Sequence, residues 1–378
     1  MGRLKDWLEE TARRGWEKVD KTVCSRCLDT PDIWRLSRAN SKRGTCDYCH
    51  RSTQVIPVSC AQEIIHRTID HYFAAPEHAG VPWVDGEWGI SSLDTQEVLD
   101  DLGFDPCDDL RRDILDASSN DMWVEAAHGH WANRHEEDVL LDGWENFVSA
   151  TKHQTRYHFR DAPPGRYRDG VQVGEMLQVL AECIEPLIKT VDEKDDLFRA
   201  RILPPGQNVS ATTMGPPPNE VASAGRMNPA GIPYFYAAFN RQTALFEVGD
   251  TNQTQAAVAL FRPTRPLRIV NLAKIIKVPS PFALDRRKER NDAMFLWGFT
   301  EAISRKVTKD GREHIDYVPT QIVCEYIAQV YRTSAGETID GLMYSSAVDE
   351  GALNIVIFPS GEYWERDRFP NVKFIGPT

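Results

Sequence analysis

The sequence lacks a long apolar run. No stretch of its 378 residues approaches the ~20 apolar residues that a membrane-spanning helix needs. The opening residues, Met1-Gly2-Arg3-Leu4-Lys5-Asp6, also lack the apolar segment of a secretory signal. These two absences predict a protein of the cytoplasm that makes no contact with a membrane.

Cysteine is scarce, and the 8 residues in the chain are too few for a disulfide scaffold of this length. Four of them form two pairs, Cys24-Ser-Arg-Cys27 and Cys46-Asp-Tyr-Cys49, with 18 residues between the pairs. Two Cys-x-x-Cys knuckles at this separation predict a tetrahedral Zn²⁺ site of four thiolates. We expect a structural site, because four cysteines leave no coordination position open. His50 could compete with Cys49, although the symmetric spacing favours Cys49.

Positive charge is in deficit, with 44 Lys and Arg against 56 Asp and Glu, a net charge of −12. That balance makes nucleic acid an unexpected partner for the chain as a whole. The charge is uneven, because residues 1–55 carry 12 basic and 8 acidic side chains, whereas residues 85–146 carry 3 and 18. Local contact with nucleic acid stays open for the basic residues between the knuckles, namely Arg35, Arg38, Lys42 and Arg43.

Apolar periodicity predicts an α+β protein with a helical N-terminal part. The chain divides into an N-terminal helix and zinc module over 1–57, a mainly helical domain over 58–190, and a mixed domain over 191–378. Strands are expected where β-branched and apolar runs lie between turn residues, over residues 256–263, 267–272, 341–344 and 354–358. Helices are expected over residues 4–19, 64–73, 95–102, 110–115, 176–188, 287–305 and 320–331.

The segment 197–247 is the centre of the mixed domain. Pro and Gly are so dense over 204–231 that we expect no helix or central strand there. A loop of that length inside a compact domain is usually functional. Arginines, several aromatic rings and Glu247 lie in or beside this loop, and together they suit an anionic ligand that has a flat ring and a cationic centre.

Several motifs follow one another in a fixed order through this part of the chain. They are Leu197-Phe-Arg-Ala-Arg201, Gly225-Arg-Met-Asn-Pro-Ala-Gly-Ile-Pro233, Tyr236, Thr243-Ala-Leu-Phe-Glu247, Gly341-Leu-Met-Tyr-Ser-Ser346 and Asn354-Ile-Val-Ile-Phe358. In that order they resemble the RES domain, which is named for its Arg, Glu and Ser residues and is found in bacterial toxins of toxin–antitoxin pairs. The paired cysteines give the N-terminal half a weaker resemblance to the helical HEPN/RES N-terminal domain that precedes some RES domains.

The resemblance implies a fold like that of ADP-ribosyltransferases and cleavage of the nicotinamide–ribose bond of NAD⁺. That bond breaks through a transition state with oxocarbenium character, and nicotinamide leaves as a neutral molecule, so no strong general acid is needed. Arg199 and Arg226 then suit the pyrophosphate, because a guanidinium binds phosphate oxygens through two parallel hydrogen bonds. Tyr236 offers a ring for stacking.

Glu247 could bind a ribose hydroxyl, face the oxocarbenium or orient a nucleophile. Ser346, with Tyr344 beside it, would bind the nicotinamide amide or the ribose, and Asn354 would brace the loop beside the bound NAD⁺. The sequence leaves close neighbours open as alternatives, with Arg201 for Arg199, Tyr234 for Tyr236 and Ser345 for Ser346. Ser345 also departs from the family, in which a Pro or a charged residue often stands before the Ser.

The leading hypothesis is therefore a toxin-like enzyme that consumes NAD⁺ by hydrolysis or phosphorolysis, with a cognate antitoxin as its partner. One alternative is a protein ADP-ribosyltransferase, and another is a zinc-ribbon binding protein with an inactive RES domain. HEPN ribonucleases carry an Arg-x4–6-His motif. Ribonuclease activity is not expected here, because the only such spacing, from Arg43 to His50, runs across the second cysteine knuckle. The nucleophile and a homo-oligomeric state stay open.

Overall fold

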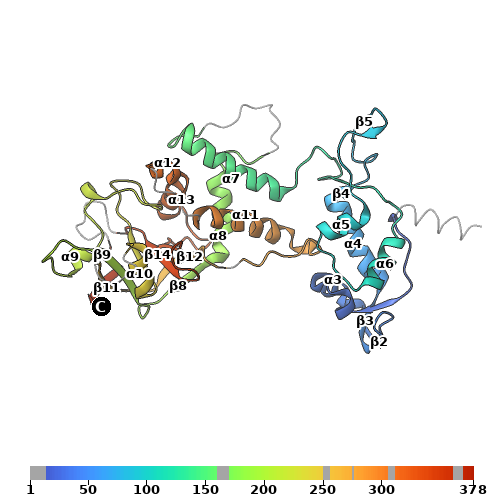
Figure 1. Ribbon diagram of the computed structural model, residues 1–378, viewed down its shortest axis with the longest axis horizontal. Coiled ribbons are helices and arrows are strands. Elements are labelled where there is room, and N and C mark those ends of the chain that lie inside the picture. The colour runs from blue at the N-terminus through green and yellow to red at the C-terminus, as the bar shows by residue number, and fades with distance from the viewer. Residues whose placement is uncertain (1–13, 160–169, 250–255, 275, 305–310, 361–368) are drawn as a thin grey trace, which may run out of the picture. The chain divides into compact units, whose positions relative to one another are not determined.

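The computed structural model describes residues 14–159, 170–249, 256–274, 276–304, 311–360 and 369–378 (Figure 1). Contacts divide the chain into an N-terminal unit of residues 1–139 with 277–294, and a C-terminal unit of residues 140–276 with 295–378. The helix expected over 4–19 lies largely outside the described residues. Among the described helices, none has the length and apolar character needed to cross a membrane.

The N-terminal unit combines short strands with several helices. Its elements are β1 (Thr22–Cys24), α2 (Ser25–Leu28), α3 (Pro31–Ser37), η1 (Arg38–Asn40), β2 (Lys42–Thr45), β3 (Ser52–Pro57), α4 (Val58–Tyr72), β4 (Phe73–Ala74), β5 (Trp83–Val84), β6 (Glu87–Trp88), α5 (Thr95–Asp101), α6 (Asp108–Asp116), β7 (Val124–Glu125) and η4 (Leu284–Arg286).

A small antiparallel sheet of order β1-β3-β2 and helices α3 to α6 enclose the core of this unit. Helix α4 buries Ile65 and Ile69, which lie one turn apart on one face. Phe282, from the second segment of the unit, is buried in the same core and contacts Phe104 edge-on with ring centroids 5.9 Å apart. The 277–294 segment is therefore part of this core, although it follows the first segment by more than a hundred residues.

The C-terminal unit is built around a single large sheet. Its elements are α8 (Met176–Ile184), η2 (Glu185–Leu187), β8 (Ile188–Val191), β9 (Leu197–Ile202), α9 (Ala211–Met214), η3 (Asn219–Val221), β10 (Phe235–Ala238), α10 (Arg241–Glu247), β11 (Ala256–Pro263), β12 (Leu267–Asn271), α12 (Glu313–Asp316), α13 (Val318–Gln329), β13 (Gly341–Ser345), β14 (Leu353–Ile357) and β15 (Val372–Pro377). Two further helices, α7 (Glu136–His153) and α11 (Arg287–Ser304), begin in the N-terminal unit and continue into this one.

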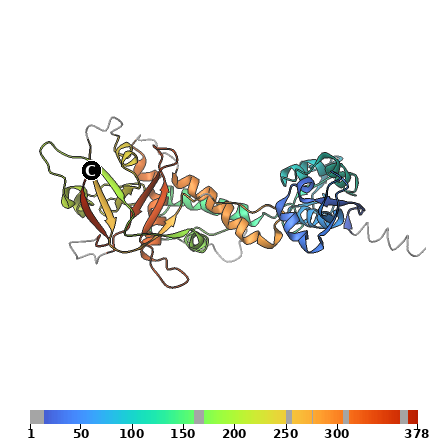
Figure 2. The ribbon, with the colours of Figure 1, turned by 90° about the horizontal axis from the view of Figure 1, so that it is seen from below.

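The eight strands follow the order β15-β11-β9-β10-β14-β13-β12-β8, with β12 and β13 parallel and the other pairs antiparallel (Figure 2). Side chains alternate between the two faces of the sheet. Leu342 and Val356 lie on the face that α7, α8, α11 and α13 cover, where Trp144 of α7 contacts Phe299 of α11. Met343 and Ile355 point to the opposite face, into a second cluster.

The α+β class predicted from the sequence is confirmed, with helices and a mixed sheet in the C-terminal part. The expectation that no helix runs through 204–231 is wrong, because α9 forms a single turn there. The side chain of Ser210 accepts a hydrogen bond from the backbone N–H of Thr213, and this capping interaction supports the short helix between the prolines. Contacts group residues 140–190 with the C-terminal unit, so the helical domain expected over 58–190 is divided between the two units.

Candidate active site and metal centre

The cavity of interest opens where two neighbouring strands separate. Strands β9 and β10 pair at Ala238 and Phe198, and no further register pair joins them in the described sheet. Just beyond this point, Nη1 of Arg199 donates a hydrogen bond of 2.8 Å to the backbone carbonyl of Tyr236. The guanidinium thus satisfies a backbone acceptor that the adjacent strand leaves unpaired.

A cavity of about 360 Å³ lies at this separation. That volume is within the range of small-molecule sites, roughly 300–1,000 Å³. The wall comes from β9, β10, α10, β13 and β14, and combines two guanidiniums, a carboxylate, a carboxamide and two phenols with small apolar side chains. Its members are Phe198, Arg199, Ala200, Arg201, Tyr236, Ala237, Ala238, Ala244, Glu247, Val248, Tyr344 and Asn354.

Glu247 is held at the last residue of α10 by two donors. Its Oε1 accepts hydrogen bonds from Oγ of Ser346 at 2.7 Å and from Nδ2 of Asn354 at 2.6 Å. Within the described part of the chain, the second carboxylate oxygen has no hydrogen-bond partner. The carboxylate is thus oriented through one oxygen, while the side chain as a whole remains exposed beside the cavity.

The local fold explains why these three residues meet. Asn240 caps the N-terminus of α10, because its side chain accepts from the backbone N–H of Thr243, and the helix ends at Glu247. Asn354 on β14 stands directly opposite Tyr344 on β13, and Ser346 follows the end of β13. Oγ of Ser346 also accepts from the backbone N–H groups of Val348 and Asp349, at 3.2 Å each, which closes the turn after β13.

Two arginines lie on one face of β9. Burial, and then the neighbouring Arg201, lower the pKa of Arg199 to about 9, so its guanidinium stays charged at neutral pH. That guanidinium also lies over the ring of Phe235 at 5.1 Å, a cation–π contact. Burial likewise lowers the pKa of Arg201, whose Nη1 donates to the carbonyl of Thr213 at 3.0 Å. Neither guanidinium has a carboxylate partner among the described residues.

Tyr236 and Tyr234 have different surroundings. The ring of Tyr236 lines the cavity, while its hydroxyl donates to Oδ1 of Asn228 at 2.8 Å and accepts from the backbone N–H of Met227 at 3.1 Å. Burial raises the pKa of Tyr236 well above its ordinary value, so the phenol stays protonated. Tyr234 is buried in the core against Phe358.

The loop that carries Arg226 is fastened to the start of α13. Oγ1 of Thr320 donates to the carbonyl of Arg226 at 2.6 Å. Nε2 of Gln321 donates to the carbonyls of Gly225 and Asn228, at 2.8 and 3.0 Å. Gly225 has no room for a side chain, because a Cβ there would lie 2.5 Å from Oδ1 of Asn228. The backbone at Arg226 is therefore fixed from two sides.

Arg226 acts on the site through its charge. Burial, and then the negative charge of Glu247, raise the pKa of Tyr344, whereas Arg226 opposes that rise. Tyr344 is a wall residue of the cavity, so both charges act at its wall. Arg226 itself is not one of the wall residues.

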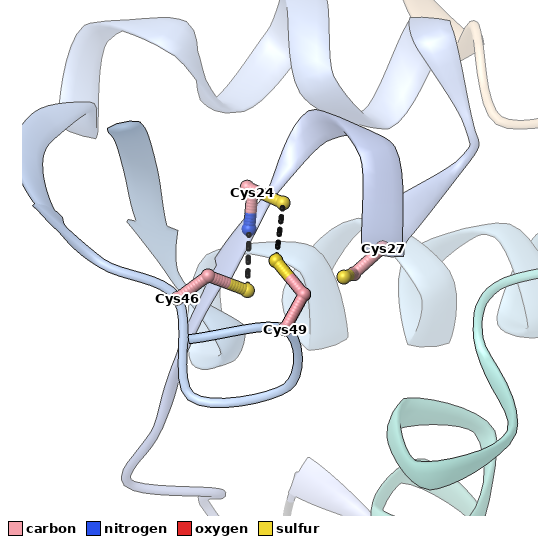
Figure 3. Close-up of side chains that lie close together, drawn as sticks. All are labelled: Cys24, Cys27, Cys46 and Cys49. Carbon is pink, nitrogen blue, oxygen red and sulfur yellow. Dashed lines mark hydrogen bonds between the residues drawn. The ribbon is translucent and has the colours of Figure 1, made fainter. Parts of the chain in front are cut away.

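The four knuckle cysteines meet in the N-terminal unit (Figure 3). The Sγ atoms of Cys24, Cys27, Cys46 and Cys49 all lie within 4.8 Å of one another, and those of Cys24 and Cys49 are 3.7 Å apart. Zn–S bonds of about 2.3 Å in a tetrahedron place the sulfurs roughly 3.8 Å apart, so the spacing suits this ion. His50 is exposed and is not a member of the cluster.

Comparison with protein families identifies both halves of the chain. Residues 196–368 match the RES domain, and residues 39–164 match the HEPN/RES N-terminal domain 1. The C-terminal half of this chain is a RES domain. A comparison with curated proteins gave no match, and neither did one with solved structures.

The RES domain brings most of the predicted residues to one place. Arg199, Tyr236, Glu247, Tyr344 and Asn354 are wall residues of the cavity. Ser346 is not a wall residue but bonds to Glu247. Of the open alternatives, Arg201 also lines the cavity, and the contact to Glu247 is made by Ser346 rather than by Ser345.

Sequence reasoning assigned no role to three side chains of the RES domain. Asn228, Thr320 and Gln321 position the Arg226 loop and the hydroxyl of Tyr236. Asn228 lay inside the Gly-Arg-Met-Asn motif, so it could have been singled out. Thr320 and Gln321 belong to the start of an ordinary helix, and no chemical pattern marks them.

Proposed function

We propose that the RES domain of this protein consumes NAD⁺ by cleaving the bond between nicotinamide and ribose. The family match supports a toxin-like, NAD-related enzyme. The observation that carries the proposal is the carboxylate of Glu247, fixed through one oxygen by Ser346 and Asn354, beside a cavity whose wall includes two partly buried guanidiniums.

The chemistry requires a fixed negative charge near the ribose. When the C–N bond breaks, its electron pair leaves with nicotinamide, and positive charge develops on the ribose ring. A carboxylate that is already oriented stabilises this charge without reorganising during the reaction. Glu247 has one oxygen occupied by donors, which leaves the other for the ribose or its hydroxyl groups.

The arginines supply the complementary half of the site. In our proposal Arg199 and Arg226 bind the pyrophosphate, and Arg201 adds a further positive charge beside Arg199. Arg199 and Arg201 have no carboxylate partner among the described residues, which strengthens their attraction for phosphate oxygens in a partly buried site. Tyr236 presents its ring to nicotinamide or ribose, because its hydroxyl is engaged in holding the Arg226 loop.

The nucleophile that attacks the ribose decides which reaction takes place. Water would add its oxygen to the anomeric carbon and release a proton, giving ADP-ribose, whereas phosphate would give ADP-ribose-1″-phosphate. A protein side chain in the same position would make the enzyme an ADP-ribosyltransferase. All three share the site up to the oxocarbenium, so the products distinguish them.

The test is loss of NAD⁺ with purified protein, with nicotinamide and the ADP-ribose products resolved by chromatography. Glu247→Gln keeps the shape but removes the charge, so we expect the rate to fall by about 100-fold or more. Glu193→Gln, an exposed carboxylate in the turn between β8 and β9, is the matched control and should retain the full rate. Absence of NAD⁺ loss in the wild type would favour the binding-protein alternative.

We further propose a setting and a metal for the enzyme. As a RES toxin it would act in the cytoplasm and be restrained by a cognate antitoxin. The cysteine cluster would hold one structural Zn²⁺, because four soft sulfur donors in a buried position suit that ion and leave no site for a substrate. Bound zinc would cross-link β1 and α2 to the turn between β2 and β3.

A further inference from the structure

The β2–β3 hairpin beside the cysteine cluster has an unusual composition. Its strands begin Lys42-Arg-Gly-Thr45 and, after the knuckle turn and Arg51, Ser52-Thr-Gln54. These residues are cations, hydroxyls and one amide, with no acidic and no apolar side chain among them. All of them are exposed except Gly44. In a chain of net charge −12, this is a local reversal of the surface charge.

The pairing of the strands arranges these groups in rows. Arg43 stands opposite Gln54, and Thr45 stands opposite Ser52, so these four side chains share one face of the hairpin. Strand β2 is the edge of the β1-β3-β2 sheet. The hairpin therefore presents an outer row of hydrogen-bond donors spaced by the sheet itself.

The positively charged side chains of this hairpin are exposed. Among the described residues, no ion pair involves Lys42, Arg43 or Arg51. Arg35, which also lies between the knuckles, differs because it donates two hydrogen bonds of 2.8 Å to the carboxylate of Asp285. Arg35 thus joins two segments of the unit, whereas the side chains of Lys42, Arg43 and Arg51 face solvent.

The acidic residue in the knuckle turn is already engaged. Oδ2 of Asp47, in the knuckle turn, accepts from the backbone N–H of Thr22 at 2.5 Å and from its hydroxyl at 2.8 Å. These hydrogen bonds lower the pKa of Asp47 and hold its carboxylate to β1. It braces the turn and leaves Arg43 and the hydroxyl groups of the row unchanged.

We propose that the β2–β3 hairpin binds the phosphate backbone of a nucleic acid. Phosphate oxygens are contacted in such complexes by Arg and Lys together with Ser, Thr and Gln donors, which is the set found here. An apolar protein partner is disfavoured, because the exposed residues of the two strands include no apolar side chain. The cysteine cluster joins the two strands at the knuckle, so the donors are held in place before binding and less entropy is lost.

The proposal has consequences for how binding depends on salt and sequence. Each phosphate contact contributes about −0.9 to the slope of log K against log salt on a duplex and about −0.7 on a single strand. Three cations predict slopes of roughly −2 to −3. The interaction should be independent of base sequence, because backbone contacts position a protein without reading bases.

The experiment measures fluorescence anisotropy of a labelled single strand, and of the duplex of the same sequence, with the full chain at several salt concentrations. The variant Lys42→Gln/Arg43→Gln/Arg51→Gln is compared with Lys189→Gln/Lys194→Gln/Lys373→Gln, which removes the same charge from exposed positions of the C-terminal unit. The charge-retaining variant Lys42→Arg/Arg43→Lys/Arg51→Lys tests whether charge suffices. NAD⁺ cleavage is measured in parallel and should be the same in all of them.

We expect the hairpin variant to bind at least tenfold more weakly and to lose most of the salt slope, while the other two variants bind like the wild type. Equal weakening by both neutral variants would overturn the proposal, because net charge alone would then explain binding. Displacement by polyglutamate as effective as that by unlabelled DNA would identify an acidic polypeptide as the partner instead. Absence of binding by the wild type at low salt would equally reject it.

Discussion

At the scale of single residues, the candidate site depends on how one carboxylate is held. Oε1 of Glu247 receives two short hydrogen bonds, and each donor comes from a different strand or strand end. Donors to a charged acceptor contribute roughly 1.5–3 kcal/mol each. The orientation of Glu247 is therefore sensitive to changes at positions that need not touch the substrate.

Ser346→Ala tests this arrangement. It removes the 2.7 Å hydrogen bond to Glu247 while Asn354 still holds the same oxygen, so we expect kcat for NAD⁺ cleavage to fall about tenfold, which corresponds to ~1.4 kcal/mol. Ser345→Ala is the matched control at the adjacent position and should change kcat little. Steady-state kinetics of both variants decide the matter, and equal losses would mean that the turn, rather than the hydrogen bond, is responsible.

The identities of these residues could be predicted from the sequence, but their contacts could not. The order of motifs singled out Glu247 and Ser346, which lie 99 positions apart. Only the pairing of β13 with β14 and the length of α10 bring them together, and neither follows from local periodicity. Gln321 is the opposite case, because its role comes entirely from a loop folded against the helix end.

At the scale of elements, α4 contains a buried histidine. His66 is 4% exposed, its ring lies 5.5 Å from that of Trp16 in a stacked arrangement, and its Nε2 has no hydrogen-bond partner among the described residues. Burial lowers its pKa from 6.5 to about 4. The free energy of unfolding therefore depends on whether His66 of α4 binds a proton.

The predicted effect is loss of stability in acid. Between pH 6.5 and 4 the unfolded chain binds a proton at His66 that the folded chain does not, so the free energy of unfolding falls as pH falls, by at most roughly 3 kcal/mol. His66→Phe keeps a ring but cannot titrate, and urea unfolding followed by circular dichroism at pH 7 and 4.5 should show a smaller fall. Burial also lowers the pKa of His71 to about 4, which leaves a residual dependence.

The control for this prediction is His78→Gln, at an exposed position of the same unit. Its pH dependence should match that of the wild type. A wild-type dependence that persists unchanged in His66→Phe would show that other groups are responsible for acid sensitivity.

The positions of helices and strands were easier to predict than the elements against which they pack. The strands expected at 256–263 and 267–272 and the helix expected at 287–305 lie close to β11, β12 and α11, because their apolar patterns are strong. The same patterns do not say what an apolar face packs against. Helix α8 reads as part of an N-terminal helical domain, yet Met176 and Leu180 are buried in the core that covers the RES sheet.

At the scale of the whole molecule, the two units should respond differently to metal removal. Zinc contributes about 10 kcal/mol or more to the folding of small zinc modules. We therefore expect chelation, or Cys46→Ser, to lower the unfolding temperature of the N-terminal unit. The RES cavity, whose wall lies wholly in the C-terminal unit, should keep its NAD⁺ cleavage.

Metal analysis and calorimetry check this expectation together. The wild type should contain about one zinc per chain, as one tetrahedral four-sulfur site requires. Cys46→Ser should lose it, with one of two calorimetric transitions shifted. Cys183→Ser changes a buried cysteine outside the cluster and should retain the metal. Purified wild-type protein without zinc would contradict the assignment.

The return of residues 277–294 to the N-terminal unit has a consequence for synthesis of the protein. Phe282 and Asp285 contact Phe104 and Arg35, which the ribosome makes far earlier. During translation the first 139 residues must wait for this segment to emerge, by which time strands β8 to β12 of the RES sheet have already been made. We expect the nascent N-terminal unit to complete its fold only after most of the C-terminal unit has been synthesised. The N-terminal unit therefore cannot fold first and restrain the RES domain while that domain is being made.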